Sequence, residues 1–315
     1  MYPRLSDLFS DLFGLELPVP IYSFGAMVAV AFLVAAWLGR KELDRLHAEG
    51  RLPAVPLPVR EKKGSRVRKT LQRVRPGLLV GNLTVIAVFG GFAGAKLFHI
   101  LENPGDFAAD PLGMLFSTGG FTFYGGLIVA AAGVAWYVRK KGLPVWTVAD
   151  AVAPGLMLAY GIGRLGCHLA GDGDWGIPAD LSARPGWLPV WLWAETYPNN
   201  ILGVDLSGAP VYPTPIYEFV AAALLFAVLW GLRRHPFLGG WLFSLYLVLN
   251  GLERFLIEQI RVNVRFDLFG LSVTQAEVLA VVLMAAGGFG LVRTWKRRAE
   301  AGVPAAMPQP AAEGG

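Results

Sequence analysis

Residues 21–39 read IYSFGAMVAVAFLVAAWLG and contain no charged side chain. A helix of about 20 apolar residues can cross the hydrocarbon core of a bilayer, so this run, taken as about 20–39, predicts a transmembrane helix. Six further runs of similar length follow it, at 77–99, 120–138, 145–168, 214–232, 238–258 and 270–292. The sequence therefore predicts an all-α, polytopic membrane protein with seven transmembrane helices.

The composition agrees with this fold class and excludes others. Of the 315 residues, 54% are hydrophobic and only 16% are charged, whereas soluble domains average about 25% charged residues. These values exclude a disordered protein and a coiled coil. The single cysteine excludes a disulfide framework, and the histidines have no ligand-spaced partners. We therefore predict neither a metal site nor a cofactor.

The basic residues are concentrated on one side of the predicted bundle. Of the 28 lysines and arginines, 21 lie in four segments that share one side if every run crosses: 40–75, 139–141, 233–234 and 293–298. The opposite loops, 100–119 and 169–213, are acidic. Because loops rich in Lys and Arg stay in the cytoplasm, the N-terminus is predicted outside and the C-terminus inside.

The domain organisation follows from these spans. We expect a single transmembrane catalytic domain over 1–298, with an outer cap at about 169–213, and a disordered cytoplasmic tail over 299–315 that is rich in Ala, Pro and Gly. The basic segment at about 40–76 is interpreted as a topological anchor on anionic lipid. Its prolines and its lack of interleaved aromatic residues argue against a nucleic-acid partner.

Several charged residues fall in or near predicted membrane spans, where a charge costs free energy. Lys96, Arg164 and Arg254 lie within predicted spans and Arg261 just beyond one. A charge at the centre of a membrane helix costs at least about 2.5–3.5 kcal/mol, so such side chains should face the bundle interior or a wet cavity. One interpretation is internal ion pairing with the acids of the same spans. The other is a functional cavity, since two arginines at one depth suit an anionic phosphate.

Two short segments place further polar and small residues near the same depth. Residues 161–176 read GIGRLGCHLAGDGDWG, and FTFYGGLIV (121–129) opens another span on the same side. On the helix over 238–258, Asn250, Arg254 and Glu258 share one face with Arg261, at spacings of four, four and three. The sequence predicts that these segments converge at the outer leaflet.

These blocks, in this order, resemble those of a known family. The chain resembles the prolipoprotein diacylglyceryl transferases, which are bacterial inner-membrane enzymes. The resemblance is carried by PIYSFGAMVAVAFL (20–33), GFAGAKLFHILE (91–102), ADAVAPGLMLAYGIGRLGC (149–167), PTPIYE (213–218), NGLERFLIEQIR (250–261) and LSVTQ (271–275), besides the YGG block. It implies a multi-pass protein of the bacterial inner (cytoplasmic) membrane whose outer side faces the periplasm.

The resemblance also implies a reaction and its partners. The diacylglyceryl group of phosphatidylglycerol would move to the thiol of a prolipoprotein signal-peptide cysteine, and glycerol phosphate would leave. Arg164 and Arg254 match the family's two essential arginines and would bind the phosphate. The other residues expected at the substrate are Lys96, Gly125, Gly126, Asp172, Asp174, Tyr217, Glu218, Asn250 and Arg261. For Lys96, which replaces the family's usual arginine, a structural ion pair is the alternative.

This chain departs from the family's usual pattern at several positions. Tyr124 stands where most members have a histidine before Gly-Gly, and Cys167 and Ala170 replace two asparagines. The general base is left open among Tyr124, His168 and Glu258, and Glu218 could also take a proton. Glu218 and Glu258 could instead neutralise the arginines, and Tyr124 could instead position the substrate. A nucleophilic role for Cys167 is less favoured than a packing role. The alternatives to the transferase are a divergent member with changed or lost activity and a transporter of an anionic substrate.

The predicted outer cap is rich in aromatic residues, namely Trp175, Trp187, Trp191, Trp193 and Tyr197. Trp and Tyr prefer the membrane interface, which explains the cluster without any further role. The alternative is that the cap covers the cavity and meets the signal peptide.

Overall fold

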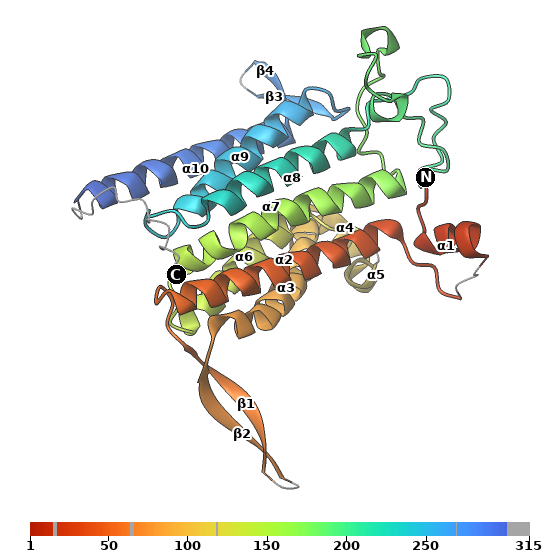
Figure 1. The fold of residues 1–315 in the computed structure, drawn as a ribbon. Coiled ribbons are helices and arrows are strands. Elements are labelled where there is room, and N and C mark those ends of the chain that lie inside the picture. The colour runs from red at the N-terminus through yellow and green to blue at the C-terminus, as the bar shows by residue number, and fades with distance from the viewer. Residues whose placement is uncertain (15–17, 64–65, 118, 269, 301–315) are drawn as a thin grey trace. The chain divides into compact units, whose positions relative to one another are not determined.

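The computed structural model describes residues 1–14, 18–63, 66–117, 119–268 and 270–300. The chain forms two compact units, one of Met1–Ala35 with Ala149–Gly315 and one of Ala36–Val148 (Figure 1). Helix α2 (Ser23–Ala48) and helix α7 (Val145–Ala170) each begin in one unit and end in the other.

The long helices of the structure correspond to the predicted spans. Besides α2 and α7 these are α3 (Val80–Glu102), α6 (Phe123–Lys140), α8 (Thr214–Leu232), α9 (Trp241–Glu258) and α10 (Gln275–Glu300). Within the described residues, five helical segments are long and apolar enough to cross a membrane: Ser23–Ala48, Pro76–Glu102, Val145–Ala170, Thr214–Leu232 and Gln275–Arg297. The prediction of a helical, polytopic membrane protein is confirmed to this extent.

In the first unit, helices α7 to α10 run side by side (Figure 1). Their shared core contains Met157 of α7, Ala222 and Leu229 of α8, and Leu242 of α9. Helix α9 packs against both α8 and α10. A Cβ atom on Gly251 would lie 2.7 Å from the carbonyl oxygen of Ala280. Glycine is therefore needed where α9 crosses α10.

The start of α9 is fixed by a side chain of α7. The Asp150 carboxylate accepts hydrogen bonds from the backbone N–H groups of Gly240, at 2.7 Å, and Phe243, at 2.8 Å. The first N–H groups of a helix have no partner within the helix, so this contact satisfies two of them. It also fixes the position of the helix that carries Arg254 and Glu258.

The remaining named elements of the first unit lie near the end of α7, the start of α8 and the end of α9 (Figure 1). The unit also contains α1 (Leu5–Phe13) and the hairpin of β3 (Arg265–Leu268) and β4 (Leu271–Thr274). The predicted cap holds only the short 3-10 turns η2 (Leu181–Ala183) and η3 (Val190–Leu192). It is held by short backbone bridges, which join Pro178 and Glu195 to Val211.

In the second unit, α3 and α6 pack with their backbones close together. A Cβ atom on Gly125 would lie 2.6 Å from the carbonyl oxygen of Gly94, and one on Gly126 would lie 2.7 Å from that of Gly91. The backbone N–H of Thr122 also donates to the carbonyl oxygen of Ala95, at 3.0 Å. The Gly-Gly pair therefore has a packing role at the start of α6.

The unit is completed by short elements, which are η1 (Pro76–Leu79), α4 (Pro104–Ala109), α5 (Pro111–Phe116), β1 (Val55–Lys63) and β2 (Arg66–Val74). Strands β1 and β2 form an antiparallel hairpin that extends away from the helices (Figure 1). The strict all-α prediction is therefore wrong for two hairpins. The run Val55-Pro56-Leu57-Pro58-Val59 alternates apolar residues with prolines, and proline is tolerated in an edge strand.

The predicted tail, 299–315, lies almost entirely outside the described residues. Helix α10 continues to Glu300, two residues into that tail. The predicted disorder of the remainder stays a prediction.

Candidate functional site

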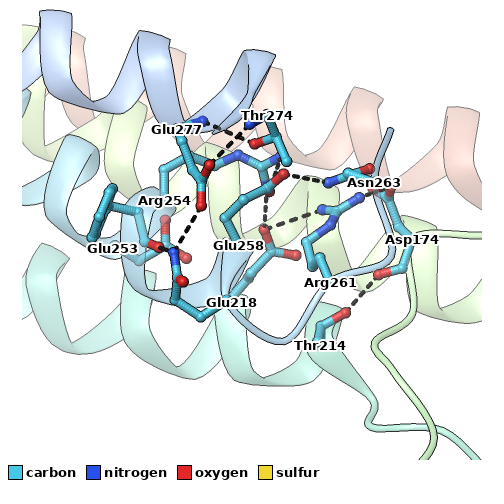
Figure 2. A network of polar contacts seen from close by, with 12 residues as sticks. Asp174, Thr214, Glu218, Glu253, Arg254, Glu258, Arg261, Asn263, Thr274 and Glu277 are labelled. Carbon is cyan, nitrogen blue, oxygen red and sulfur yellow. Dashed lines mark hydrogen bonds and ion pairs between the residues drawn. The ribbon is translucent and has the colours of Figure 1, made fainter. Parts of the chain in front are cut away.

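The centre of the site is Glu218, in the first turns of α8. Its side chain is fully buried, and its Oε1 atom faces three guanidinium groups. The distances from Oε1 are 3.3 Å to Arg164 Nε, 3.2 Å to Arg254 Nη1 and 3.6 Å to Arg261 Nη1. We call Arg164, Arg254 and Arg261 the arginine trio. Figure 2 shows Arg254 and Arg261 approaching Glu218 from different directions.

Each member of the arginine trio also contacts a second acid. Arg164 and Arg261 both form ion pairs with Asp174, through different carboxylate oxygens. Arg254 Nη2 lies 3.0 Å from Glu258 Oε2, one helical turn along α9. Burial opposes ionisation of Asp174, but the two guanidinium groups outweigh it and hold the pKa of that carboxyl below its ordinary value. The cluster therefore alternates three cations with three acids.

Glycines allow the loop after α7 to reach this cluster. Gly171 and Gly173 have φ values of 60° and 96°, which favour glycine. A Cβ atom on Gly176 would lie 2.7 Å from the carbonyl oxygen of Ile260. The Thr214 hydroxyl donates to the Asp174 carbonyl oxygen at 2.6 Å. These contacts place the Asp174 carboxylate against the end of α9 and the start of α8.

Three residues that the sequence analysis did not select support the cluster. The Tyr160 hydroxyl donates to Glu218 Oε1 at 2.9 Å and lies 3.4 Å from Glu253 Oε1. Asn263 Nδ2 donates to Glu258 Oε1 at 2.7 Å. Their position in the sequence could have indicated two of them. Tyr160 lies one turn before Arg164 on α7, and Glu253 lies directly before Arg254.

Part of the hydrogen-bonding capacity of this buried cluster is unused. Among the described residues, the buried Nε and Nη1 atoms of Arg261 and the Oε2 atom of Glu218 have no hydrogen-bond partner. Buried polar groups are usually paired, since an unpaired one costs free energy. Guanidinium donors with free capacity are suited to bind an anion such as phosphate.

Comparison with known proteins identifies the family. Residues 59–293 match the family described as prolipoprotein diacylglyceryl transferase, over more than half of the chain. The chain belongs to this family.

Individual proteins that are similar to nearly the whole chain carry a name that agrees with this family. The chain is similar to proteins named phosphatidylglycerol–prolipoprotein diacylglyceryl transferase from several bacteria. The Vibrio cholerae serotype O1 (strain ATCC 39541 / Classical Ogawa 395 / O395) protein is 30% identical over 285 residues, covering 89% of each chain. The Clostridium tetani (strain Massachusetts / E88) protein is 28% identical over 287 residues, covering 91% of this chain and 98% of its own.

Most of the residues that the resemblance selected in the first unit meet in one place. Ion pairs directly join six of these residues, namely Arg164, Asp174, Glu218, Arg254, Glu258 and Arg261. Asn250 lies one turn before Arg254 and is half-buried. Tyr217 instead donates its hydroxyl to the Leu192 carbonyl oxygen at 2.7 Å, which ties α8 to the cap.

His168 and Cys167 lie beside the cluster, near the cap. His168 Nδ1 lies 3.1 Å from the hydroxyl of the buried Tyr197, whose ring packs against that of Trp175. The sulfur of Cys167 and the carboxylates of Asp172 and Asp174 lie within 4.8 Å of one another, a spacing that a metal ion could accept. Both oxygens of Asp174 already pair with arginines, so this donor set fits a cation poorly.

The other selected residues belong to the second unit. Tyr124 lies half-buried in the first turn of α6, and Gly125 and Gly126 are buried against α3. The Lys96 ammonium donates to the Ser117 carbonyl oxygen (3.1 Å), the Ser117 hydroxyl (2.7 Å) and the Gly119 carbonyl oxygen (2.9 Å). These contacts use all three of its donors, so Lys96 holds the loop before α6. The predicted roles of Tyr124 and Lys96 at the substrate stay predictions.

Proposed function

We propose that this protein transfers the diacylglyceryl group of phosphatidylglycerol to the signal-peptide cysteine of prolipoproteins, which is the first step of lipoprotein maturation. The observation that supports it best is the arginine trio, gathered in a buried site by α7, α8 and the end of α9. The family match and the names of the relatives agree with this chemistry.

The proposed step makes one bond and breaks one. The thiol sulfur attacks the glyceryl carbon that carries the phosphate ester, and the new S–C bond is a thioether. The C–O bond breaks, its electron pair stays on oxygen, and glycerol phosphate leaves. The thiol proton passes to a base, because the thiolate is the effective nucleophile.

The arginine trio supplies the stabilisation that this step needs. Negative charge develops on the phosphate oxygen as the C–O bond breaks, and preorganised guanidinium donors in a dry site stabilise such charge strongly. Arginine suits this task because its planar fork binds two oxygens of a phosphate at once. Asn250, Asp172 and Asp174 are proposed to position the headgroup around the trio. The base is proposed to be Tyr124, His168 or Glu258.

We further propose the arrangement in the bacterial inner membrane. Seven helices, including α6 and α9, cross the bilayer within a single domain over 1–298, with the N-terminus in the periplasm and the C-terminus in the cytoplasm. The uneven distribution of Lys and Arg supports this orientation. The cap over 169–213 would then lie on the periplasmic side, where the lipid headgroup and the substrate cysteine meet.

Complementation tests the proposed function. A bacterial strain depleted of its own transferase would express the wild-type chain, and lipoprotein modification would be followed by gel shift. We expect the wild type to restore modification and Arg254→Ala to abolish it while still inserting into the membrane. Normal modification by Arg254→Ala would refute the phosphate-binding role of the trio. A well-expressed wild type that restores nothing would favour a changed activity.

A further inference from the structure

Glu218 differs from the other acids of the cluster in the number of arginines that it contacts. Among the described residues it alone pairs with all three members of the arginine trio. Asp174 pairs with two of them and Glu258 with one. We propose that Glu218 is an internal counter-anion that competes with the phosphate for the trio and speeds release of the glycerol phosphate product. This inference rests on the proposed function.

The position of Glu218 supports the competition. Three guanidinium groups converge on its single Oε1 atom, at 3.2–3.6 Å. The point where three cations converge is also the best position for an oxygen of a bound phosphate. The Glu218 carboxylate and a phosphate cannot occupy this point at the same time. A phosphate can therefore bind the trio fully only if the Glu218 carboxylate moves aside.

The contacts of Glu218 allow such a movement. Its Oε2 atom has no hydrogen-bond partner, while its Oε1 atom also accepts from Tyr160. Within the described residues, all polar contacts of the carboxylate therefore run through Oε1, and no hydrogen bond of Oε2 has to break when the carboxylate moves aside. Asp174 and Glu258 differ from Glu218 in this respect, because each is contacted through both carboxylate oxygens. Asp174 pairs through both oxygens, and Glu258 is bound by Asn263 as well as by Arg254.

The charges explain why the exchange favours release of product. The trio carries three positive charges, and Asp174, Glu218 and Glu258 balance them. The substrate phosphodiester carries one negative charge, whereas a phosphate monoester carries about −1.5 to −2 near pH 7. The arginines alone would therefore hold the product more tightly than the substrate. When Glu218 returns to the trio, it replaces the product's contacts and repels its extra charge.

The test is product inhibition of the purified, full-length enzyme in phosphatidylglycerol-containing nanodiscs, with a lipobox peptide as acceptor and glycerol 1-phosphate as inhibitor. We expect Glu218→Gln to lower the inhibition constant about tenfold, equal to about 1.4 kcal/mol. We also expect it to lower kcat and the KM for phosphatidylglycerol together. Glu253→Gln is the matched control, since Glu253 shares the Tyr160 hydroxyl but pairs with no member of the trio. Its inhibition constant should match the wild type.

Two outcomes would overturn the inference. One is an inhibition constant in Glu218→Gln that equals or exceeds that of the wild type, and the other is an equal tightening in Glu253→Gln. If Glu218→Gln does not fold, Glu218→Asp withdraws the charge by one carbon and should tighten inhibition to a smaller degree. No tightening there would also overturn it. A wild type without any turnover would instead refute the proposed function, so the two failures can be told apart.

Discussion

At the scale of single residues, the geometry of each guanidinium group explains why the site uses arginine. Arg261 is nearly buried, with 6% of its side chain exposed, and reaches Asp174 with one nitrogen and Glu218 with another. A lysine would offer one point charge in place of this fork. All three members of the trio could be predicted from their costly positions in the sequence, whereas the motifs of the family mark only Arg164 and Arg254 as essential.

Arg261→Lys should therefore lower kcat/KM at least about tenfold although the charge is kept, since one ammonium cannot contact both acids as the fork does. Steady-state transfer to a lipobox peptide measures the effect. Arg265→Lys makes the same change at an exposed position on β3 and is the control. An Arg261→Lys enzyme as active as this control would show that the fork is not needed.

The ion pairs of Asp174 predict how the stability of the folded protein changes with pH. The pKa of the Asp174 carboxyl is lower in the folded protein than in the unfolded chain. Its ion pairs therefore stabilise the fold fully above the unfolded pKa of about 3.9. This stabilisation is lost as the pH falls through the lower pKa of the folded protein. Asp174→Asn should lower the melting temperature at neutral pH. The gap to the wild type should narrow below about pH 4. Thermal unfolding over a pH series measures this, and a constant gap would contradict it.

At the scale of elements, apolar runs in the sequence predict the helices well. They do not predict which strands pair or which side chains of different helices contact one another. The predicted span 214–232 coincides with α8, because its ends are marked by Pro213 and by Arg233. The β1–β2 hairpin was missed, because its register depends on pairing between strands and its charges suggested a lipid-bound segment. Tyr160 and Glu253 were missed for a similar reason, since each gains its role from a partner on another helix.

The crossing of α9 and α10 can be tested with a matched pair of glycines. Gly251→Ala places a Cβ atom 2.7 Å from the Ala280 carbonyl oxygen, whereas a Cβ atom on Gly288 meets nothing within 4 Å. We expect Gly251→Ala to destabilise by about 1–3 kcal/mol, as overpacking does, and Gly288→Ala to be neutral or stabilising. Thermal unfolding in nanodiscs compares them. Equal stability of the two variants would contradict this close crossing.

At the scale of the whole molecule, the membrane orientation depends on where the charges lie. Ser207 lies in the predicted periplasmic cap, and the β1–β2 hairpin lies in the predicted basic cytoplasmic segment. In a Cys167→Ser background, Ser207→Cys should react with a membrane-impermeant maleimide in intact cells. Leu71→Cys, at an exposed position on β2, should react only after the membrane is permeabilised. The reverse labelling pattern would contradict the proposed orientation.

The proposed function combines these scales, since the helices position the trio and the trio is proposed to bind the phosphate of the substrate. The most direct measurement is mass spectrometry of a lipobox peptide incubated with the purified wild-type protein in phosphatidylglycerol vesicles. We predict a diacylglyceryl adduct on the cysteine, an equal amount of released glycerol phosphate, and neither product from Arg254→Ala. A folded wild-type protein that yields no adduct, or one that modifies a peptide whose cysteine is replaced by serine, would contradict this account.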